Sequence, residues 1–259
     1  MLAFGAHPDD VEISCAGTLR ALQGAGCEVC VATMTLGDCG SRELPPDDVR
    51  RVRRAEAEAA CRILGAGYYY GGSNDFRIFN DDAHNGRTTL VMRLVAPQIV
   101  LTHSPGDYML DHDATSVLVR NACFYASAPN YDAGGHAGAK AMEAVPHLFY
   151  WDVMEGCDMF GKPVAPEFYV DISDVIDLKT EMLAAHKSQR EWLRAQHGID
   201  EYLDSMRAWS ARRGEDASRI ACRKIAYAEA FRQHRGHAYP RNSVIEETLR
   251  DRVVRNPRY

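Results

Sequence analysis

Short apolar runs alternate along the first half of the chain with longer segments whose apolar residues recur at helical spacing. The apolar runs are rich in β-branched or aromatic residues, which predicts buried strands at residues 1–6, 28–36, 67–72 and 98–102. The segments between and after them predict helices at residues 15–24, 45–64, 86–94 and 111–126. Strands that alternate with helices indicate an α/β protein with a mostly parallel sheet and helices on both faces.

The second half of the chain is less regular. Residues 128–145 are rich in glycine and alanine and predict a surface loop. Further strands are predicted at residues 148–153 and 168–172, and further helices at residues 173–192, 200–209 and 218–232. From Tyr239 onward the chain is polar and basic, which predicts a tail packed on the surface or on a partner. We expect a single domain over residues 1–259, with a core at about 1–190 and a helical part at about 191–259.

Composition excludes several classes of function. The chain has 259 residues, 46% of them hydrophobic, and a formal net charge of −6. No basic stripe with interleaved aromatics is present, so nucleic-acid binding is not expected. No apolar run reaches membrane-spanning length, and the N-terminus lacks the pattern of a signal peptide. We therefore expect a cytoplasmic protein that binds a small molecule and does not insert into membranes, with a homo-oligomer left open.

The eight cysteines do not change this interpretation. They do not form the repeated Cys-x-x-Cys pairs that a structural zinc site requires. We expect most of them to be buried small apolar residues, which fits a reducing compartment. Because no Gly-x-Gly-x-x-Gly follows the first strand, the fingerprint of a dinucleotide site is also absent.

Candidate chemistry begins where the first predicted strand ends, at His7-Pro8-Asp9-Asp10. In open α/β sheets, ligands bind at the carboxyl ends of the strands. Pro8 fixes its own φ and disfavours helix at His7, so this segment predicts a stiff turn. Imidazole and carboxylate are suitable ligands for Zn²⁺. The alternative interpretation is an ordinary helix N-cap at the Asp pair, with a solvated His7.

A second cluster follows the fourth predicted strand and includes His112. A parallel sheet would bring His7, Asp10 and His112 to one edge. Two imidazoles and one carboxylate with an open position are typical of a catalytic zinc site, so we expect one Zn²⁺ per chain. Asp9 would remain free beside this site as the base for a metal-bound water.

These residues carry a resemblance to a known family. Residues 7–12 resemble the AHPDDxE signature of the PIG-L/LmbE-like zinc deacetylases, and residues 107–112 resemble that family's second motif, His-Pro-Asp-His. Arg53-x-x-Glu56 and residues 185–189 resemble further segments of the family, so the resemblance covers roughly the first 190 residues. It implies a Rossmann-like fold and hydrolysis of an N-acetyl group, usually on an N-acetylglucosamine-type small-molecule conjugate.

The resemblance also implies site roles. By motif position, His7, Asp10 and His112 correspond to zinc ligands and Asp9 to the general base. The first His of the second motif falls on Met109, whose thioether cannot hydrogen-bond as an imidazole does. Three nearby residues could take its place: His103, Asp107 and Tyr108. Otherwise the enzyme is weaker or its substrate geometry differs. The alternatives for these three are a satisfied strand-end histidine, a turn cap and a packing residue, respectively.

Four further residues are expected around the site. Asp111 is predicted to orient His112 or to cap its helix. Glu12 is predicted to support the ligands rather than react. Asp38 lies in a glycine-rich loop that is either a simple turn or part of a pocket rim. His186 is a candidate through the resemblance alone.

Two other functions stay open from sequence. A metal-dependent phosphohydrolase also uses His and Asp clusters, but it would need two metals and more carboxylate ligands. A non-catalytic binding protein on the same fold would explain Met109 as a sign of lost activity. The retained Asp9 argues against that reading, because a binder needs no base.

Overall fold

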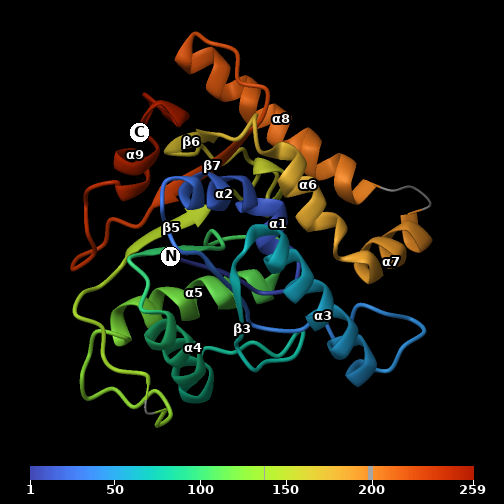
Figure 1. The fold of residues 1–259 in the computed structure, drawn as a ribbon, viewed down its shortest axis with the longest axis vertical. Helices are drawn as coiled ribbons and strands as arrows, with labels where there is room; N and C mark the ends of the chain where they lie inside the picture. The colour runs from blue at the N-terminus through green and yellow to red at the C-terminus, as the bar shows by residue number, and fades with distance from the viewer. Residues whose placement is uncertain (137, 198–200) are drawn as a thin grey trace.

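The computed structural model describes residues 1–136, 138–197 and 201–259. Within these residues one sheet of eight strands forms, in the order β3-β2-β1-β4-β5-β7-β6-β8 (Figure 1). The strands are β1 (Leu2–Gly5), β2 (Cys30–Thr33), β3 (Gly67–Tyr70), β4 (Ile99–Thr102), β5 (His147–Trp151), β6 (Phe168–Asp171), β7 (Ala228–Gln233) and β8 (Val253–Arg255). The first five are parallel, whereas β7 pairs antiparallel with β5 and β6, and β8 antiparallel with β6. The predicted mostly parallel α/β sheet is confirmed.

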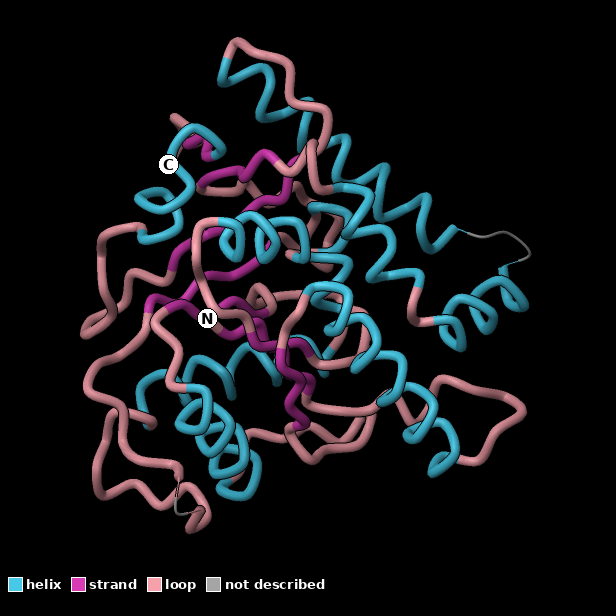
Figure 2. Tube along the Cα trace, in the orientation of Figure 1, coloured by secondary structure: helices cyan, strands magenta, loops and turns pink. Residues whose placement is uncertain are grey.

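Helices surround the sheet, with the strands running through the centre of the trace (Figure 2). They are α1 (Asp10–Ser14), α2 (Ala16–Gly24), α3 (Pro46–Leu64), α4 (Asp82–Val95), α5 (Leu110–Tyr125), α6 (Ile176–Ala184), α7 (Lys187–His197), α8 (Glu201–Ala221) and α9 (Val244–Leu249). Two short 3₁₀ helices, η1 (Met154–Gly156) and η2 (Arg250–Arg252), complete the elements. None of the helices in these described ranges is both long and apolar enough to cross a bilayer.

The alternation of side chains along β1 contributes to two apolar cores on opposite faces of the sheet. Leu2 and Phe4 of β1 belong to the core that includes Met92 of α4. Ala3, between them, belongs to the opposite core, which includes Leu22 of α2. Successive side chains of a strand point to opposite faces, so each strand contributes to both layers. Burying an aliphatic or aromatic side chain of this size contributes about 1.5–3 kcal/mol, and helices on both faces are therefore required to cover the sheet.

The order of the strands places both sequence motifs at one point. β1 pairs with β2 on one side and with β4 on the other, so the direction of winding reverses between β1 and β4. Such a switch point opens a crevice outside the carboxyl ends of the two strands, where ligands bind in open α/β sheets. β1 leads into residues 6–10, and β4 leads into residues 103–112.

Several predicted elements were wrong in the C-terminal half. The helix predicted at residues 173–192 is interrupted, and α6 and α7 replace it. The helix predicted at residues 218–232 ends at Ala221, and residues 228–233 form β7. In β7, Ala228 and Ala230 pack into one core and Phe231 into another, an alternation of strand type that a short alanine-rich segment conceals. Because β7 lies between β5 and β6, both of its edges are hydrogen-bonded.

The region after residue 190 is therefore not wholly helical, and the predicted C-terminal tail contains α9 and β8. The expectation that most cysteines are buried is also wrong. All eight are free thiols, and three of them are buried: Cys15, Cys61 and Cys123.

Candidate metal centre and active site

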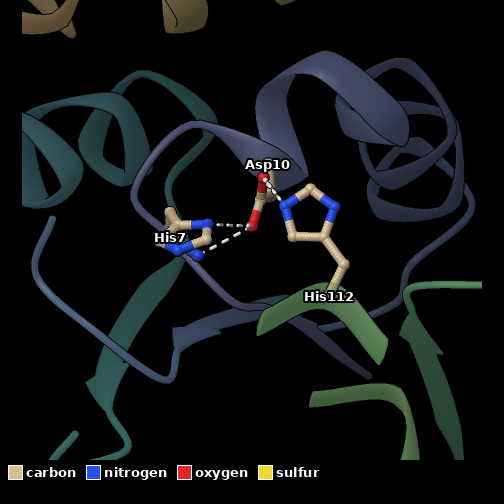
Figure 3. Close-up of side chains that lie close together, drawn as sticks. All are labelled: His7, Asp10 and His112. Carbon is tan, nitrogen blue, oxygen red and sulfur yellow. Dashed lines mark hydrogen bonds and ion pairs between the residues drawn. The ribbon is translucent and has the colours of Figure 1, made fainter. Parts of the chain in front are cut away.

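Three side chains from the two motifs converge at the switch point. Ligand atoms of His7, Asp10 and His112 all lie within 4.8 Å of one another (Figure 3). Asp10 Oδ2 is 3.6 Å from His7 Nδ1, and Asp10 Oδ1 is 3.4 Å from His112 Nε2. The exposed fraction of these side chains is 11% for His7, 6% for Asp10 and 3% for His112. The three predicted ligands are thus brought together in a site that excludes most water.

The turn after β1 brings the carboxylate of Asp10 against the backbone and the imidazole of His7. The backbone N–H of His7 donates to Asp10 Oδ2 at 2.7 Å, which closes the turn. A Cβ atom on Gly5 would lie 2.9 Å from the Asp10 Cβ, so the close approach requires glycine. Asp9, between Pro8 and Asp10, has a φ of 111°, a conformation that costs of order 1–3 kcal/mol outside glycine. Such strain persists only where the surroundings hold it.

Each imidazole of the cluster has a carboxylate at its remaining nitrogen. His7 Nε2 hydrogen-bonds with Asp111 Oδ2 at 3.0 Å, and His112 Nδ1 lies 3.2 Å from Asp107 Oδ1. The backbone N–H of Phe76 also donates to Asp111 Oδ2, at 2.8 Å. A carboxylate on the far nitrogen fixes the tautomer and ring orientation of metal-binding histidines.

These contacts correct two predictions. Asp111 contacts His7 rather than His112, and it is not a helix cap, because Met109 is the N-cap residue of α5. The residue beside His112 is Asp107. Asp107, from the loop before α5, and Asp111, from the first turn of α5, therefore support one imidazole each.

The electrostatics of the cluster favour a positive charge within it. Burial lowers the pKa of His7, but its hydrogen bonds with Asp10 and Asp111 outweigh burial and raise that pKa to about 9. Burial likewise lowers the pKa of His112, whereas Asp10 and Asp107 raise it to about 10. Burial would raise the pKa of Asp10, but His112 and His103 hold it well below its usual range. A cation here, whether a proton or a metal ion, is compensated by carboxylates on three sides.

His103 lies beside this cluster, fully enclosed. Its Nε2 accepts from the backbone N–H of Ala6 at 3.0 Å and lies 3.1 Å from Asp10 Oδ2. Its ring stacks on that of His112 with centroids 4.0 Å apart. Burial lowers the pKa of His103 to about 4, so the imidazole is neutral. His103, Asp107 and His112 also lie close enough to share a metal ion, an alternative group that overlaps the first at His112.

Tyr108 lies at the rim. It is 64% exposed, and its ring meets that of His112 edge-on with centroids 5.3 Å apart. Tyr108 directly precedes Met109 in the sequence, and its hydroxyl is a hydrogen-bond donor.

The sequence predicts that Asp9 is free beside the metal ligands, but in the structure its carboxylate is hydrogen-bonded. The Tyr202 hydroxyl donates to Asp9 Oδ2 at 2.6 Å, and Arg53 Nη2 lies 3.4 Å from the same oxygen. Arg53 is 3% exposed and also donates to the carbonyl of Pro8, so its guanidinium is enclosed beside Asp9 rather than solvated. Burial raises the pKa of Asp9 although Arg53 opposes this. Tyr202 was missed because it lies 193 residues from Asp9 along the chain.

The other predicted residues fall into two groups next to the cluster. Glu12 Oε1 lies 3.4 Å from His186 Nε2, and both residues are buried. Asp38 accepts from the backbone N–H of Asp75 at 2.8 Å and pairs with Arg50 at 2.9 Å. Glu12, His186 and Asp38 do not belong to the three-residue cluster of His7, Asp10 and His112.

Asp75 is a site residue that sequence reasoning missed. It is 7% exposed, and its Oδ1 atom has no hydrogen-bond partner among the described residues. Its neighbour Phe76 donates to Asp111, which in turn contacts His7. Asp75, Asp38 and Cys39 form a further group whose ligand atoms lie within 4.8 Å of one another.

A pocket extends from the cluster to α8. His112 and Asp107 line one part of it, and Trp209 and Arg213 of α8 line another part. Arg213 Nε donates to Asp152 Oδ2 at 2.6 Å, which ties α8 to the segment after β5. Part of the wall of the pocket therefore comes from segments of the chain that carry neither motif.

Fold and site together define an α/β protein with a candidate metal centre at the carboxyl ends of β1 and β4. Residues 2–123 match the family described as PIG-L: GlcNAc-PI de-N-acetylase, and these residues contain both motifs. The resemblance to the PIG-L/LmbE-like family that the motifs predicted is confirmed over this part of the chain.

Relatives in the family differ in their reactions. The 4-oxalmesaconate hydratase of Pseudomonas putida is 27% identical over 243 residues, covering 89% of this chain and 87% of the relative. The 1D-myo-inositol 2-acetamido-2-deoxy-alpha-D-glucopyranoside deacetylase of Mycobacterium leprae is 29% identical over 248 residues, covering 73% and 80%. The crystal structure of the 4-carboxy-2-hydroxymuconate hydratase from Pseudomonas putida superimposes with a TM-score of 0.75 at 25% identity, covering 93% of this chain and 97% of that one. The chain is thus related to amino-sugar deacetylases and also to a hydratase.

Proposed function

We propose that this protein is a zinc-dependent hydrolase that removes an N-acetyl group from an N-acetylglucosamine-type derivative. The observation that carries the proposal is the pair of imidazoles, His7 and His112, each supported by its own carboxylate and both adjacent to Asp10. The deacetylase relatives supply the reaction class.

The donor set fits Zn²⁺. His7 Nδ1, the Asp10 carboxylate and His112 Nε2 would hold the ion, because the other nitrogen of each imidazole faces a carboxylate. Three protein ligands leave a position for water or substrate, as in catalytic zinc sites. When bound, the ion supplies Lewis-acid polarisation of the amide carbonyl and lowers the pKa of a water molecule.

The remaining chemistry belongs to the side chains. Asp9 would take a proton from the attacking water and return it to the nitrogen as the C–N bond breaks. Tyr108, exposed beside His112, would donate its hydroxyl to the carbonyl oxygen in place of the imidazole that Met109 lacks. His103 is neutral and its Nε2 accepts from the Ala6 N–H, so we assign it to holding the turn that carries Asp10 rather than to proton transfer.

A substrate rich in hydroxyl groups suits the other side of the cluster. Asp75 Oδ1 is a buried acceptor that has no partner in the part of the chain that the structure describes, and Asp38 lies beside this residue. An unpaired buried acceptor costs about 1–3 kcal/mol, which a donor from the substrate would recover. A sugar ring supplies such donors.

A second candidate is the addition of water to a double bond of an unsaturated polycarboxylic acid. It is favoured by the length of the match to the Pseudomonas hydratase and by the loss of the family histidine at Met109. This reaction would use the same centre to orient water but would release no amine.

The test combines metal analysis with product detection. The metal-loaded protein should release a primary amine from members of a panel of N-acetylglucosamine conjugates, and chelation should abolish this activity until metal is restored. An unsaturated polycarboxylate in a parallel assay tests the second candidate through loss of its ultraviolet absorbance. Full amine release by the metal-free protein would contradict the zinc mechanism, and absence of amine release across the panel would contradict the deacetylase.

The neighbouring carboxylates provide a matched pair of variants. Asp10→Asn should lose both metal and activity, because it removes an anionic ligand. Asp9→Asn should retain metal while turnover falls by about 10²–10⁴-fold, the usual contribution of a positioned base. Equal metal loss in the two variants would mean that Asp9 also binds the ion.

A further inference from the structure

The candidate base receives a hydrogen bond from the far end of the chain. Tyr202 lies in the first turn of α8, and its hydroxyl donates to Asp9 Oδ2 at 2.6 Å. Its ring packs, partly buried, against the core that contains β1 and α2. A bond of this length to a carboxylate is charge-assisted and roughly twice as strong as a neutral one.

The contact falls on a carboxylate that needs to be held. Asp9 is the N-cap residue of α1 and has a strained backbone, with a φ of 111°. Its side chain makes no capping hydrogen bond with that helix. Arg53 approaches the same Oδ2 atom at 3.4 Å. Two donors on one oxygen fix the plane of the carboxylate and leave Oδ1 for another partner.

We infer that Tyr202 is a positioning residue that locks Oδ2 of Asp9 and presents Oδ1 to the attacking water. This inference rests on the proposed role of Asp9 as the base. In the step, a water O–H bond breaks, its proton moves to Asp9 Oδ1, and the water oxygen bonds to the amide carbon. The same proton then moves to nitrogen as the C–N bond breaks, and Tyr202 keeps its own proton throughout.

Two further facts agree with this role. Burial, and then Asp9, raise the pKa of Tyr202 well above its ordinary value, so the hydroxyl remains a donor. The helix that carries Tyr202 also lines the pocket through Trp209 and Arg213. One element thus contributes both the orientation of the base and a wall of the pocket.

The experiment uses Tyr202→Phe in the full, metal-loaded chain. Loss of the hydroxyl should lower kcat by about 10–10²-fold, the effect of misplacing a reacting group, with metal content unchanged and KM altered by less than about threefold. Tyr227→Phe is the matched control, because its hydroxyl contacts Arg207 of the same helix at 3.5 Å and lies outside the site. It should leave kcat unchanged.

A double-mutant cycle separates positioning from general structure. In an Asp9→Asn background, Tyr202→Phe should cause little further loss of kcat, because the oriented base is already gone. The melting temperature gives a readout independent of activity: Tyr202→Phe should lower it more in the parent than in Asp9→Asn, whose neutral amide is a weaker acceptor.

The outcomes distinguish the two proposals. Additive losses in kcat, or equal shifts in melting temperature in both backgrounds, would overturn the role of Tyr202. If the metal-loaded parent releases no amine, the deacetylase proposal and the catalytic role of Tyr202 both fail. The melting temperatures would then still report whether the contact with Asp9 exists.

Discussion

Replacing Asp111 by Asn tests whether His7 binds a metal ion through Nδ1. Asp111 Oδ2 accepts from the Phe76 N–H and faces His7 Nε2 at 3.0 Å. Because one carboxylate oxygen makes both contacts, the amide oxygen of Asp111→Asn can take its place and keep both. His7 Nε2 then still donates, but to a neutral acceptor, so the negative charge that supports Nδ1 as a ligand is lost.

The expected magnitude follows from this loss of charge. Nδ1 is the nitrogen that lies 3.6 Å from Asp10 Oδ2, and its basicity as a ligand is raised when Nε2 donates to a carboxylate. Loss of such an outer carboxylate weakens metal binding by about 10–100-fold, or roughly 1.4–2.8 kcal/mol. Because Asp111→Asn keeps the hydrogen bond and removes only the charge, we expect a value near the lower end of this range.

Competition against a chromophoric chelator measures the effect on metal-free protein at fixed pH. Asp174→Asn is the control, since it removes the same charge from an exposed ion pair with Arg252. Its metal affinity should equal that of the parent. Parent-like affinity in a folded Asp111→Asn protein would refute the assignment of Nδ1 and direct attention to the alternative group of His103, Asp107 and His112.

Three further results are expected. His103→Ala should lower both metal content and stability, by about 1–3 kcal/mol in urea unfolding of the metal-free protein, because the Ala6 N–H loses its buried acceptor; unchanged stability would contradict the supporting role. Metal-free protein should lose stability as pH rises from about 6.5 through 9 to 10, because folded His7 and His112 keep protons that the unfolded chain has released. Metal-loaded protein should not show this loss. Thermal melts across this range measure both, and the same dependence of melting temperature on pH with and without metal would contradict the premise. Tyr108→Phe should retain metal and reduce turnover by about tenfold or more if its hydroxyl stabilises the carbonyl oxygen, and steady-state kinetics at saturating substrate decides this.

The sheet edge and its three convergent residues could be predicted because their information is local. His7 and Asp10 follow β1 directly, and His112 lies in the first turn of α5, the helix that follows β4. Parallel strands present their carboxyl ends on one side. The stiffness at Pro8 needed no tertiary information either.

The contacts around these residues could not be predicted, because they depend on packing between distant segments. Whether Asp107 or Asp111 faces a given imidazole is decided by the direction of α5 against β1, which no spacing encodes. Arg53 belongs to a run of basic residues, a pattern typical of a solvated helix face. Its side chain is nevertheless buried against the loop that contains Asp9. Tyr202 lies 193 residues from Asp9 along the chain, and it contacts Asp9 only because α8 packs back against the sheet.

The position of β7 has a consequence for synthesis of the protein. β6 pairs with β7 and β8, so the third of the sheet beyond β5 has no hydrogen-bonded neighbour until residues 228–233 leave the ribosome. Glu229 of β7 also accepts from the backbone N–H groups of Gly17 and Thr18 and pairs with Lys179. Nascent chains shorter than this would display an open edge on β5 and two open edges on β6. Released fragments that end before and after residue 233 should therefore differ sharply in protease resistance and in self-association.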